Sequence, residues 1–184
     1  VIGEPLPDAN YVGSIVPELS ARLAPPDWQA CAKAFMTTDT YPKGAGLKTS
    51  IGTDTISFAG IAKGSGMIAP NMATMLAYVF TDLVVAADVL DAALRAACAA
   101  SFNAITVDSD TSTSDSLMVF ATGQSDVPPI ATLADPRYPD LVSALTEICL
   151  DLALQVVKDG EGASKFVTIQ LDGAESDASA RIMA

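Results

Sequence analysis

The chain is organised around one glycine-rich stretch, residues 60–78, which reads GIAKGSGMIAPNMATMLAY. Gly64, Gly66 and Pro70 lie too close together for a helix, because glycine is flexible and proline lacks a backbone donor. The first half of the stretch is therefore predicted to be an irregular loop. From Thr74 onward the sequence is apolar and rich in β-forming residues, which is typical of a strand buried on both faces. The pattern thus puts Thr74 where a loop meets a strand.

Strands are predicted on both sides of this loop. Residues 46–61 alternate polar and apolar side chains around a Gly-Thr-Asp sequence at residues 52–54, a pattern that indicates a β-hairpin. Further strands are expected over residues 74–83, 117–121 and 166–171.

Four segments have apolar residues at helical spacing, and these are residues 11–23, 28–36, 86–102 and 141–157. Pro17 falls inside the first, so that helix is expected to start later than Tyr11. Asp27 is a candidate N-cap for the second helix. Strands and helices are mixed, with neither a repeat nor a linker between them. We therefore expect residues 1–184 to form a single α/β domain, a layered α/β sandwich in which helices flank mixed sheets.

The composition limits the class of protein. The 184 residues carry a net charge of −12, which makes a nucleic-acid partner unlikely because phosphate binding requires a basic surface. A membrane span is not expected, since the longest apolar run is interrupted by Asp82. The sequence contains no histidine, so catalysis by a serine or cysteine paired with histidine is excluded within this chain. A catalytic base must then be a carboxylate, a lysine or a backbone amine.

The three cysteines, Cys31, Cys98 and Cys149, lie far apart in helical segments. They are interpreted as small core residues in a reducing compartment, and neither a disulfide framework nor a metal cluster is expected. The polar run at residues 108–116 contains several aspartates but lacks the glycine and the terminal glutamate of a calcium-binding loop. It is predicted to be a turn whose side chains bond to its own backbone.

Thr74 is a candidate nucleophile. A threonine hydroxyl requires a nearby base, and cleavage of the bond before Thr74 would free its own α-amine, whose ordinary pKa of ~7.7–8.0 suits that task. The first step would be attack of the Thr74 hydroxyl on the Ala73 carbonyl, giving an ester that water hydrolyses. Taken without further information, a threonine at the start of a strand is more commonly an ordinary strand residue.

Residues 63–76, KGSGMIAPNMATML, resemble the autoprocessing signature of the ornithine acetyltransferase (glutamate N-acetyltransferase) family, whose members cleave themselves between the alanine and the threonine of this motif. Residues 36–40, 107–115 and 160–165 also resemble that family and occur in the expected order. The resemblance covers nearly the whole chain. It implies a fold of the ornithine acetyltransferase/DmpA-like type.

The resemblance also implies an activity, which is acetyl transfer from N-acetylornithine to glutamate in arginine biosynthesis, through an acetylated Thr74. Cleavage between Ala73 and Thr74 would produce an α part, residues 1–73, and a β part, residues 74–184. Lys63, Thr40 and Glu161 match substrate-binding residues of the family. From the residues alone, the favoured interpretation is a surface lysine, a helix-capping threonine and a solvated turn glutamate.

The family further implies a cytoplasmic protein assembled from cleaved α and β chains into higher homo-oligomers, without nucleic acid or membrane. No bound cofactor is expected, although acetyl-CoA is an additional acetyl donor in bifunctional members. The family's oxyanion-hole Thr-Gly pair would lie before Val1, and a C-terminal region that completes the substrate site would follow Ala184. Two alternatives remain open: an N-terminal-nucleophile aminopeptidase or amidase that passes the acyl group to water, and an inactive fragment of the transferase.

Overall fold

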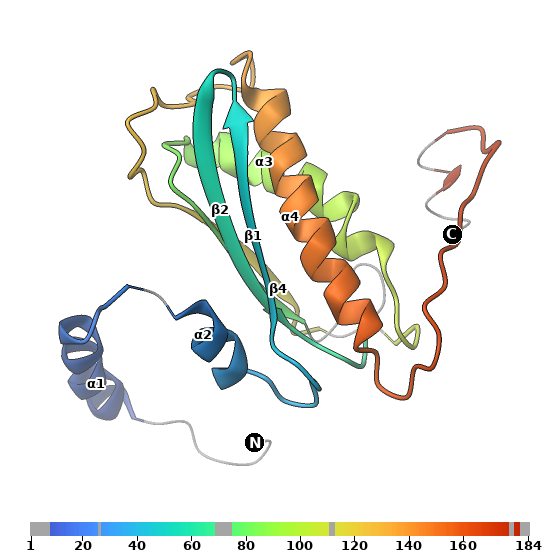
Figure 1. Cartoon of the computed structure of the whole chain (residues 1–184), viewed down its shortest axis with the longest axis horizontal. Helices are drawn as coiled ribbons and strands as arrows, with labels where there is room; N and C mark the ends of the chain where they lie inside the picture. Colours follow the sequence, from blue (N-terminus) through green and yellow to red (C-terminus); the bar gives the residue numbers. More distant parts are fainter. Residues whose placement is uncertain (1–7, 26, 69–74, 111–112, 177–178, 181–184) are drawn as a thin grey trace.

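The computed structural model describes residues 8–25, 27–68, 75–110, 113–176 and 179–180. It forms one four-stranded sheet with two long helices packed on one of its faces (Figure 1). In chain order the elements are α1 (Ala9–Ala21), α2 (Trp28–Ala34), β1 (Lys43–Ile51), β2 (Asp54–Lys63), β3 (Leu76–Thr81), α3 (Ala87–Ala99), the short 3-10 helix η1 (Phe102–Ala104), β4 (Ser116–Ala121) and α4 (Tyr138–Lys158). The predicted α/β class and mixed sheet are confirmed.

The sheet has the strand order β1-β2-β3-β4, with antiparallel pairing except between β3 and β4, which are parallel. The predicted hairpin is confirmed: Ile51 pairs with Asp54, and Gly52 adopts a positive φ of 64° in the turn between them. The hairpin was expected to end at Ile61, and Ala62 and Lys63 were expected to lie in the irregular loop. That prediction is wrong, because these residues continue the β2 ladder and the loop begins at Gly64.

Strand β3 was expected to be buried on both faces, but its burial alternates along the strand. Ala77 and Val79 are fully buried against the helices. On the opposite face, the Phe80 ring stacks on Phe120 with ring centroids 5.1 Å apart, and it also contacts Trp28 of α2 at 5.5 Å. Large apolar side chains are thus present on both faces, but only the helix-covered face is sealed from solvent.

Helices α3 and α4 supply the other half of the core. Both helical predictions are confirmed, with α4 beginning three residues earlier than expected, at Tyr138. The helix α4 lies close to β2 because Gly60 has no side chain: a Cβ there would be 2.8 Å from Cδ1 of Leu152. Leu152 itself is fully buried.

The N-terminal helices lie away from α3 and α4 (Figure 1). Helix α1 begins before Tyr11 rather than after it and contains Pro17, and none of its residues is buried. The prediction that proline would delay its start is wrong, because the Asp8 carboxylate caps the helix by accepting a hydrogen bond from the Tyr11 N–H at 2.7 Å. Asp27 caps α2 as predicted, accepting from the Ala30 N–H at 2.9 Å.

Residues 166–171 do not form the predicted strand; they have no regular secondary structure and their side chains are largely exposed, with Val167 70% and Ile169 74% accessible. Alternating sequence favours a strand only where a neighbouring strand supplies hydrogen bonds, and the described part of the chain has none beside this segment. Strand β4 matches the predicted strand at residues 117–121 and starts one residue earlier.

The cysteines are free thiols. Cys149 is buried in α4, where burial, together with the nearby Cys98, raises the pKa of its thiol to about 12. Cys31, by contrast, is exposed on α2, so its prediction as a core residue is wrong. Across the described ranges, no helix combines the length and the apolar character that crossing a membrane requires.

Candidate functional site

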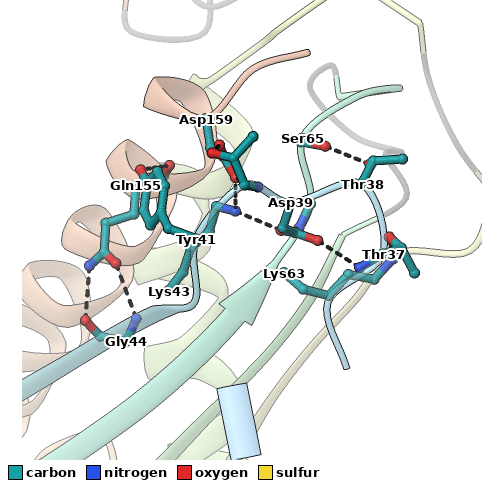
Figure 2. A network of polar contacts seen from close by, with 12 residues as sticks. Thr37, Thr38, Asp39, Tyr41, Lys43, Gly44, Lys63, Ser65, Gln155 and Asp159 are labelled. Atoms are coloured by element: carbon teal, nitrogen blue, oxygen red, sulfur yellow. Dashed lines mark hydrogen bonds and ion pairs between the residues drawn. The ribbon is translucent and has the colours of Figure 1, made fainter. Parts of the chain in front are cut away.

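A polar site surrounds the end of β2 and the loop that follows it, residues 64–68. Its centre is a buried ion cluster of Asp39, Lys43 and Asp159 (Figure 2). The Lys43 Nζ lies 2.6 Å from Oδ1 of Asp39 and 2.5 Å from Oδ2 of Asp159. These side chains come from the segment before β1, from the first residue of β1 and from the end of α4. The ion cluster therefore connects three parts of the chain.

The cluster is closed to solvent, since the side chains of Lys43 and Asp39 have no accessible surface and that of Asp159 only 2%. Burying an unpaired charge would raise the free energy of the folded state. The two carboxylates and the ammonium group are therefore stable in this position only as ion pairs with one another. The ammonium also lies 4.9 Å from the centroid of the Tyr41 ring. The Tyr41 hydroxyl in turn donates to the carbonyl of Gln155 in α4 at 2.7 Å.

Both carboxylates of the cluster are held ionised. Burial alone would raise the pKa of Asp39, but hydrogen bonds from the Gly64 N–H, the Lys43 ammonium and the Thr37 N–H outweigh burial and lower the pKa below its usual value. Burial likewise opposes ionisation of Asp159, whose pKa is nevertheless lowered by the Lys43 ammonium and by two donors of Thr40. The cluster thus carries one positive and two negative charges.

Thr40, a predicted substrate-binding residue, is joined to this cluster. Its N–H donates to Oδ2 of Asp159 at 2.9 Å, and its hydroxyl donates to Oδ1 of the same carboxylate. The residue itself is exposed. It caps no helix; its hydroxyl instead binds a carboxylate that lies 119 positions away in the sequence.

Lys63, the second predicted residue, is the last residue of β2 and is only 7% exposed. Its Nζ lies 3.3 Å from the Thr37 hydroxyl. Within the described ranges, Lys63 forms no ion pair with a carboxylate. It is therefore not a surface lysine, but a nearly buried cation beside the loop.

Glu161, the third predicted residue, is exposed just beyond α4. Its N–H donates to the Ser65 carbonyl at 2.6 Å, and its Oε2 would be 3.0 Å from a Cβ placed on Gly66. Glu161 therefore lies against the same loop that Asp39 binds through the Gly64 N–H at 2.7 Å. The fold brings Thr40, Lys63 and Glu161 to one end of the sheet.

Two further aspartates were not predicted to have this role. The Asp108 carboxylate accepts hydrogen bonds from the N–H groups of Met67 at 2.5 Å and Ile68 at 3.1 Å, and Asp115 accepts one from the Met75 N–H. Burial opposes ionisation of Asp108, but these backbone donors lower its pKa. Ile68 and Met75, whose N–H groups these two aspartates bind, lie on either side of residues 69–74 in the sequence.

The expectation that residues 108–116 bond only to their own backbone is therefore wrong in part. A local bond exists, from the Asp110 N–H to Asp108 at 3.0 Å, yet Asp108 and Asp115 also reach other segments. No sequence signal near these residues identifies their partners, which lie about 40 positions earlier. The cluster of Asp39, Lys43 and Asp159 was missed because Asp159 lies 116 positions after Lys43 in the sequence.

Ala73 and Thr74, the predicted cleavage site and nucleophile, lie outside the described residues. No group of three or more potential metal ligands is present in the ranges that the structure describes.

Comparison with known proteins shows the family of the chain. The chain is an α/β protein with a polar site at one end of a mixed sheet, and the profile of the ArgJ family matches residues 1–184. Its sequence is 50% identical to the arginine biosynthesis bifunctional proteins ArgJ of Gluconobacter oxydans and Caulobacter vibrioides, over 100% of this chain and 43% and 45% of those proteins. The chain belongs to the ArgJ family. It spans less than half the length of these curated relatives.

Among solved structures, the PH0078 protein from Pyrococcus horikoshii OT3 is similar with a TM-score of 0.45 and 12% identity, over 64% of this chain and 39% of that one.

Proposed function

We propose that the whole protein transfers an acetyl group from N-acetylornithine to glutamate, in arginine biosynthesis, through an acetylated Thr74. Membership of the ArgJ family supports the reaction class. The observation that carries the proposal is the convergence of Thr40, Lys63 and Glu161 beside residues 64–68, the segment that leads toward Ala73 and Thr74.

The proposed mechanism begins with self-cleavage. The Thr74 hydroxyl attacks the Ala73 carbonyl, and water hydrolyses the resulting ester to give residues 1–73 and 74–184. The freed amine of Thr74 is then the base that removes the proton of its own hydroxyl. Anchoring of Ile68 by Asp108 and of Met75 by Asp115 would restrict the two ends of the segment between them, which favours a defined attack geometry.

The proposed substrate contacts pair each charged group of the substrates with a side chain of opposite charge. Lys63, nearly buried and without a carboxylate partner among the described residues, is suited to an α-carboxylate, and the exposed Glu161 is suited to an ammonium group. In the first half-reaction N-acetylornithine would acetylate Thr74 and leave as ornithine. In the second half-reaction the glutamate amine would take the acetyl group from Thr74.

The remaining parts of the proposal rest on the family. They are a DmpA-like layered fold for the complete protein, assembly of cleaved α and β chains into a higher homo-oligomer, and a cytoplasmic location without membrane or nucleic-acid partners. No cofactor is proposed, and acetyl-CoA would be a second donor only if the protein is bifunctional.

The test is an intact-mass spectrum of the full-length protein beside its Thr74→Ala variant. Two fragments that meet at Ala73 and Thr74 in the wild type, and one uncut chain in the variant, are expected. An uncut wild type would overturn the mechanism. Acetyl transfer is then assayed with glutamate present and absent: release of the acetyl group to water alone would indicate a hydrolase, and no release by a cleaved, folded protein would indicate an inactive one.

A further inference from the structure

The carboxylate of Asp39 joins two segments beside the end of β2 (Figure 2). Its Oδ1 accepts a hydrogen bond from the Gly64 N–H at 2.7 Å, and its Oδ2 accepts one from the Thr37 N–H at 3.0 Å. Gly64 is the first residue after β2, and its φ of 146° lies in the region that favours glycine. Asp39 therefore holds the backbone where the chain leaves the sheet, directly after Lys63.

The same carboxylate holds the partner of Lys63. The Lys63 Nζ donates to the Thr37 hydroxyl at 3.3 Å, and the backbone of Thr37 is fixed through its own N–H to Asp39. One side chain thus fixes the main chain on both sides of this contact. A second contact between the two segments, between the hydroxyls of Thr38 and Ser65 at 2.6 Å, restricts them further.

Asp39 leaves the charge of Lys63 unbalanced. Its Oδ1 also receives the Lys43 ammonium at 2.6 Å, so both of its oxygens are occupied by other donors. Among the residues that the structure describes, no carboxylate forms an ion pair with Lys63, which is only 7% exposed. A nearly buried ammonium that contacts a neutral hydroxyl strongly attracts an anion that enters beside it.

The direction of the Lys63 ammonium depends on a rigid support. The side chains of Asp39 and Lys43 have no accessible surface, so water cannot replace their hydrogen bonds. The ammonium of Lys43 also stabilises the ionised Asp39 carboxylate in its buried position. Because a hydrogen bond between an ammonium and a carboxylate weakens when its geometry is poor, a loosened support would reduce the affinity of Lys63 for an anion.

We propose that Asp39 is a positioning residue for Lys63: by holding Gly64 and Thr37 it directs the Lys63 ammonium and so sets the preference of the site for a substrate carboxylate. This inference rests on the proposed function, in which Lys63 binds the α-carboxylate of the substrates. Since the Asp39 side chain has no accessible surface, it acts through its neighbours and does not touch a ligand.

The test measures the preference for a carboxylate in the full-length, cleaved protein. Ornithine and ornithinamide, in which a neutral amide replaces the carboxylate, are compared as inhibitors of acetyl transfer. Wild type should bind ornithine more tightly, and Lys63→Met should remove most of that preference. Asp39→Asn should reduce the ratio of the ornithinamide to the ornithine inhibition constant by about tenfold. The reason is that an amide cannot accept hydrogen bonds on both sides, so one of the two N–H groups loses its acceptor.

A double variant separates positioning from general support of the fold. Once Lys63→Met has removed the ammonium, adding Asp39→Asn should change the ratio no further. Asp140→Asn is the matched control, since that exposed carboxylate accepts the Gly52 N–H at 2.9 Å beyond the other end of β1 and should leave the ratio unchanged.

A second variant covers the case in which Asp39→Asn does not fold or does not cleave itself. Thr37→Val removes the acceptor of the Lys63 ammonium from an exposed position and leaves the ion cluster intact. It should lower the ratio in the same direction, whereas Thr37→Ser, which keeps the hydroxyl, should retain the wild-type ratio.

Each outcome has a definite meaning. An unchanged ratio in Asp39→Asn, or in Thr37→Val where it is used instead, would overturn the inference, and so would equal weakening of both compounds, because a purely structural role affects them alike. A further fall of the ratio on the Lys63→Met background would also overturn it. Equal constants for the two compounds in an active wild type would overturn the inference and leave the transfer reaction standing. A wild type that transfers no acetyl group and binds neither compound would overturn the proposed function as well.

Discussion

The ammonium group of Lys43 lies 2.5 Å from the carboxylate of Asp159, although 116 positions separate the two residues in the sequence. This contact joins the first residue of β1 to the end of α4, and both side chains are almost inaccessible to solvent. The Asp39 carboxylate shares the ammonium and also binds the Gly64 N–H, so the loop after β2 depends on the same charge.

Removing that charge should destabilise the fold. Lys43→Met would leave Asp39 and Asp159 buried without a cation, and breaking a buried pair in this way costs about 3–5 kcal/mol. Urea unfolding of the full-length protein measures the loss. Lys48→Met, an exposed position on the same strand, is the matched control and should change the free energy of unfolding by less than about 0.5 kcal/mol. Equal losses for the two variants would contradict the role of the ion cluster.

The cluster should also make stability depend on pH in the acid range. The folded pKa values of Asp39 and Asp159 lie below their unfolded values, so the stabilisation is complete above the ordinary carboxyl pKa of about 3.9. It is lost as the pH falls through the lower folded values. The urea midpoint measured from pH 7 to pH 3 should fall mainly below about pH 4. The Asp39→Asn variant should show a shallower decline, and an identical slope would contradict this assignment.

Close packing of α4 on β2 should make Gly60 intolerant of a side chain. The Cβ of Gly60→Ala would be 2.8 Å from Leu152 Cδ1 in a fully buried region, and overpacking of this kind costs about 1–3 kcal/mol. Thermal unfolding checks this, with Gly46→Ala on β1 as the control because nothing lies within 4 Å of the Cβ it would add. A Leu152→Val change made together with Gly60→Ala should recover part of the loss.

Anchoring of the loop by Asp108 should matter for self-cleavage. Asp108→Ala removes the acceptor for the Met67 and Ile68 N–H groups, so the loop before Ala73 would be held less firmly. The rate at which full-length protein converts to two fragments, followed by mass, should fall by about tenfold or more. Asp110→Ala, an exposed neighbour, should cleave at the wild-type rate. Identical rates in both variants would show that the anchor is not needed.

The two charged residues beside the loop should act mainly on substrate binding. Lys63→Ala and Glu161→Ala should each raise the Michaelis constant of at least one substrate by about tenfold, since each loses a charged hydrogen bond. Steady-state kinetics of acetyl transfer with both substrates varied gives these constants. Unchanged Michaelis constants for both substrates in both variants would remove these residues from the binding site.

Local signals in the sequence were enough to predict much of the sheet and the helices. The alternation around Gly52 specified the β1–β2 hairpin, because a two-residue turn and a two-residue period are both properties of neighbouring residues. The apolar spacing of α3 and α4 and the capping role of Asp27 are local in the same sense. The segment at residues 166–171 has an equally clear pattern but no strand, since pairing depends on a partner that the pattern does not specify.

The sequence by itself determined the family and, through the segments that resemble it, the candidate residues Thr40, Lys63 and Glu161. Tertiary structure alone decided that Lys43 is enclosed by Asp39 and Asp159, that the Thr40 hydroxyl points at a carboxylate, and that Asp108 binds the loop. The physical reason is distance along the chain. Propensity and periodicity arise among near neighbours, whereas contacts such as those of Gly64 with Asp39 and of Thr40 with Asp159 join residues that the chain separates by 25 and 119 positions and only folding brings together.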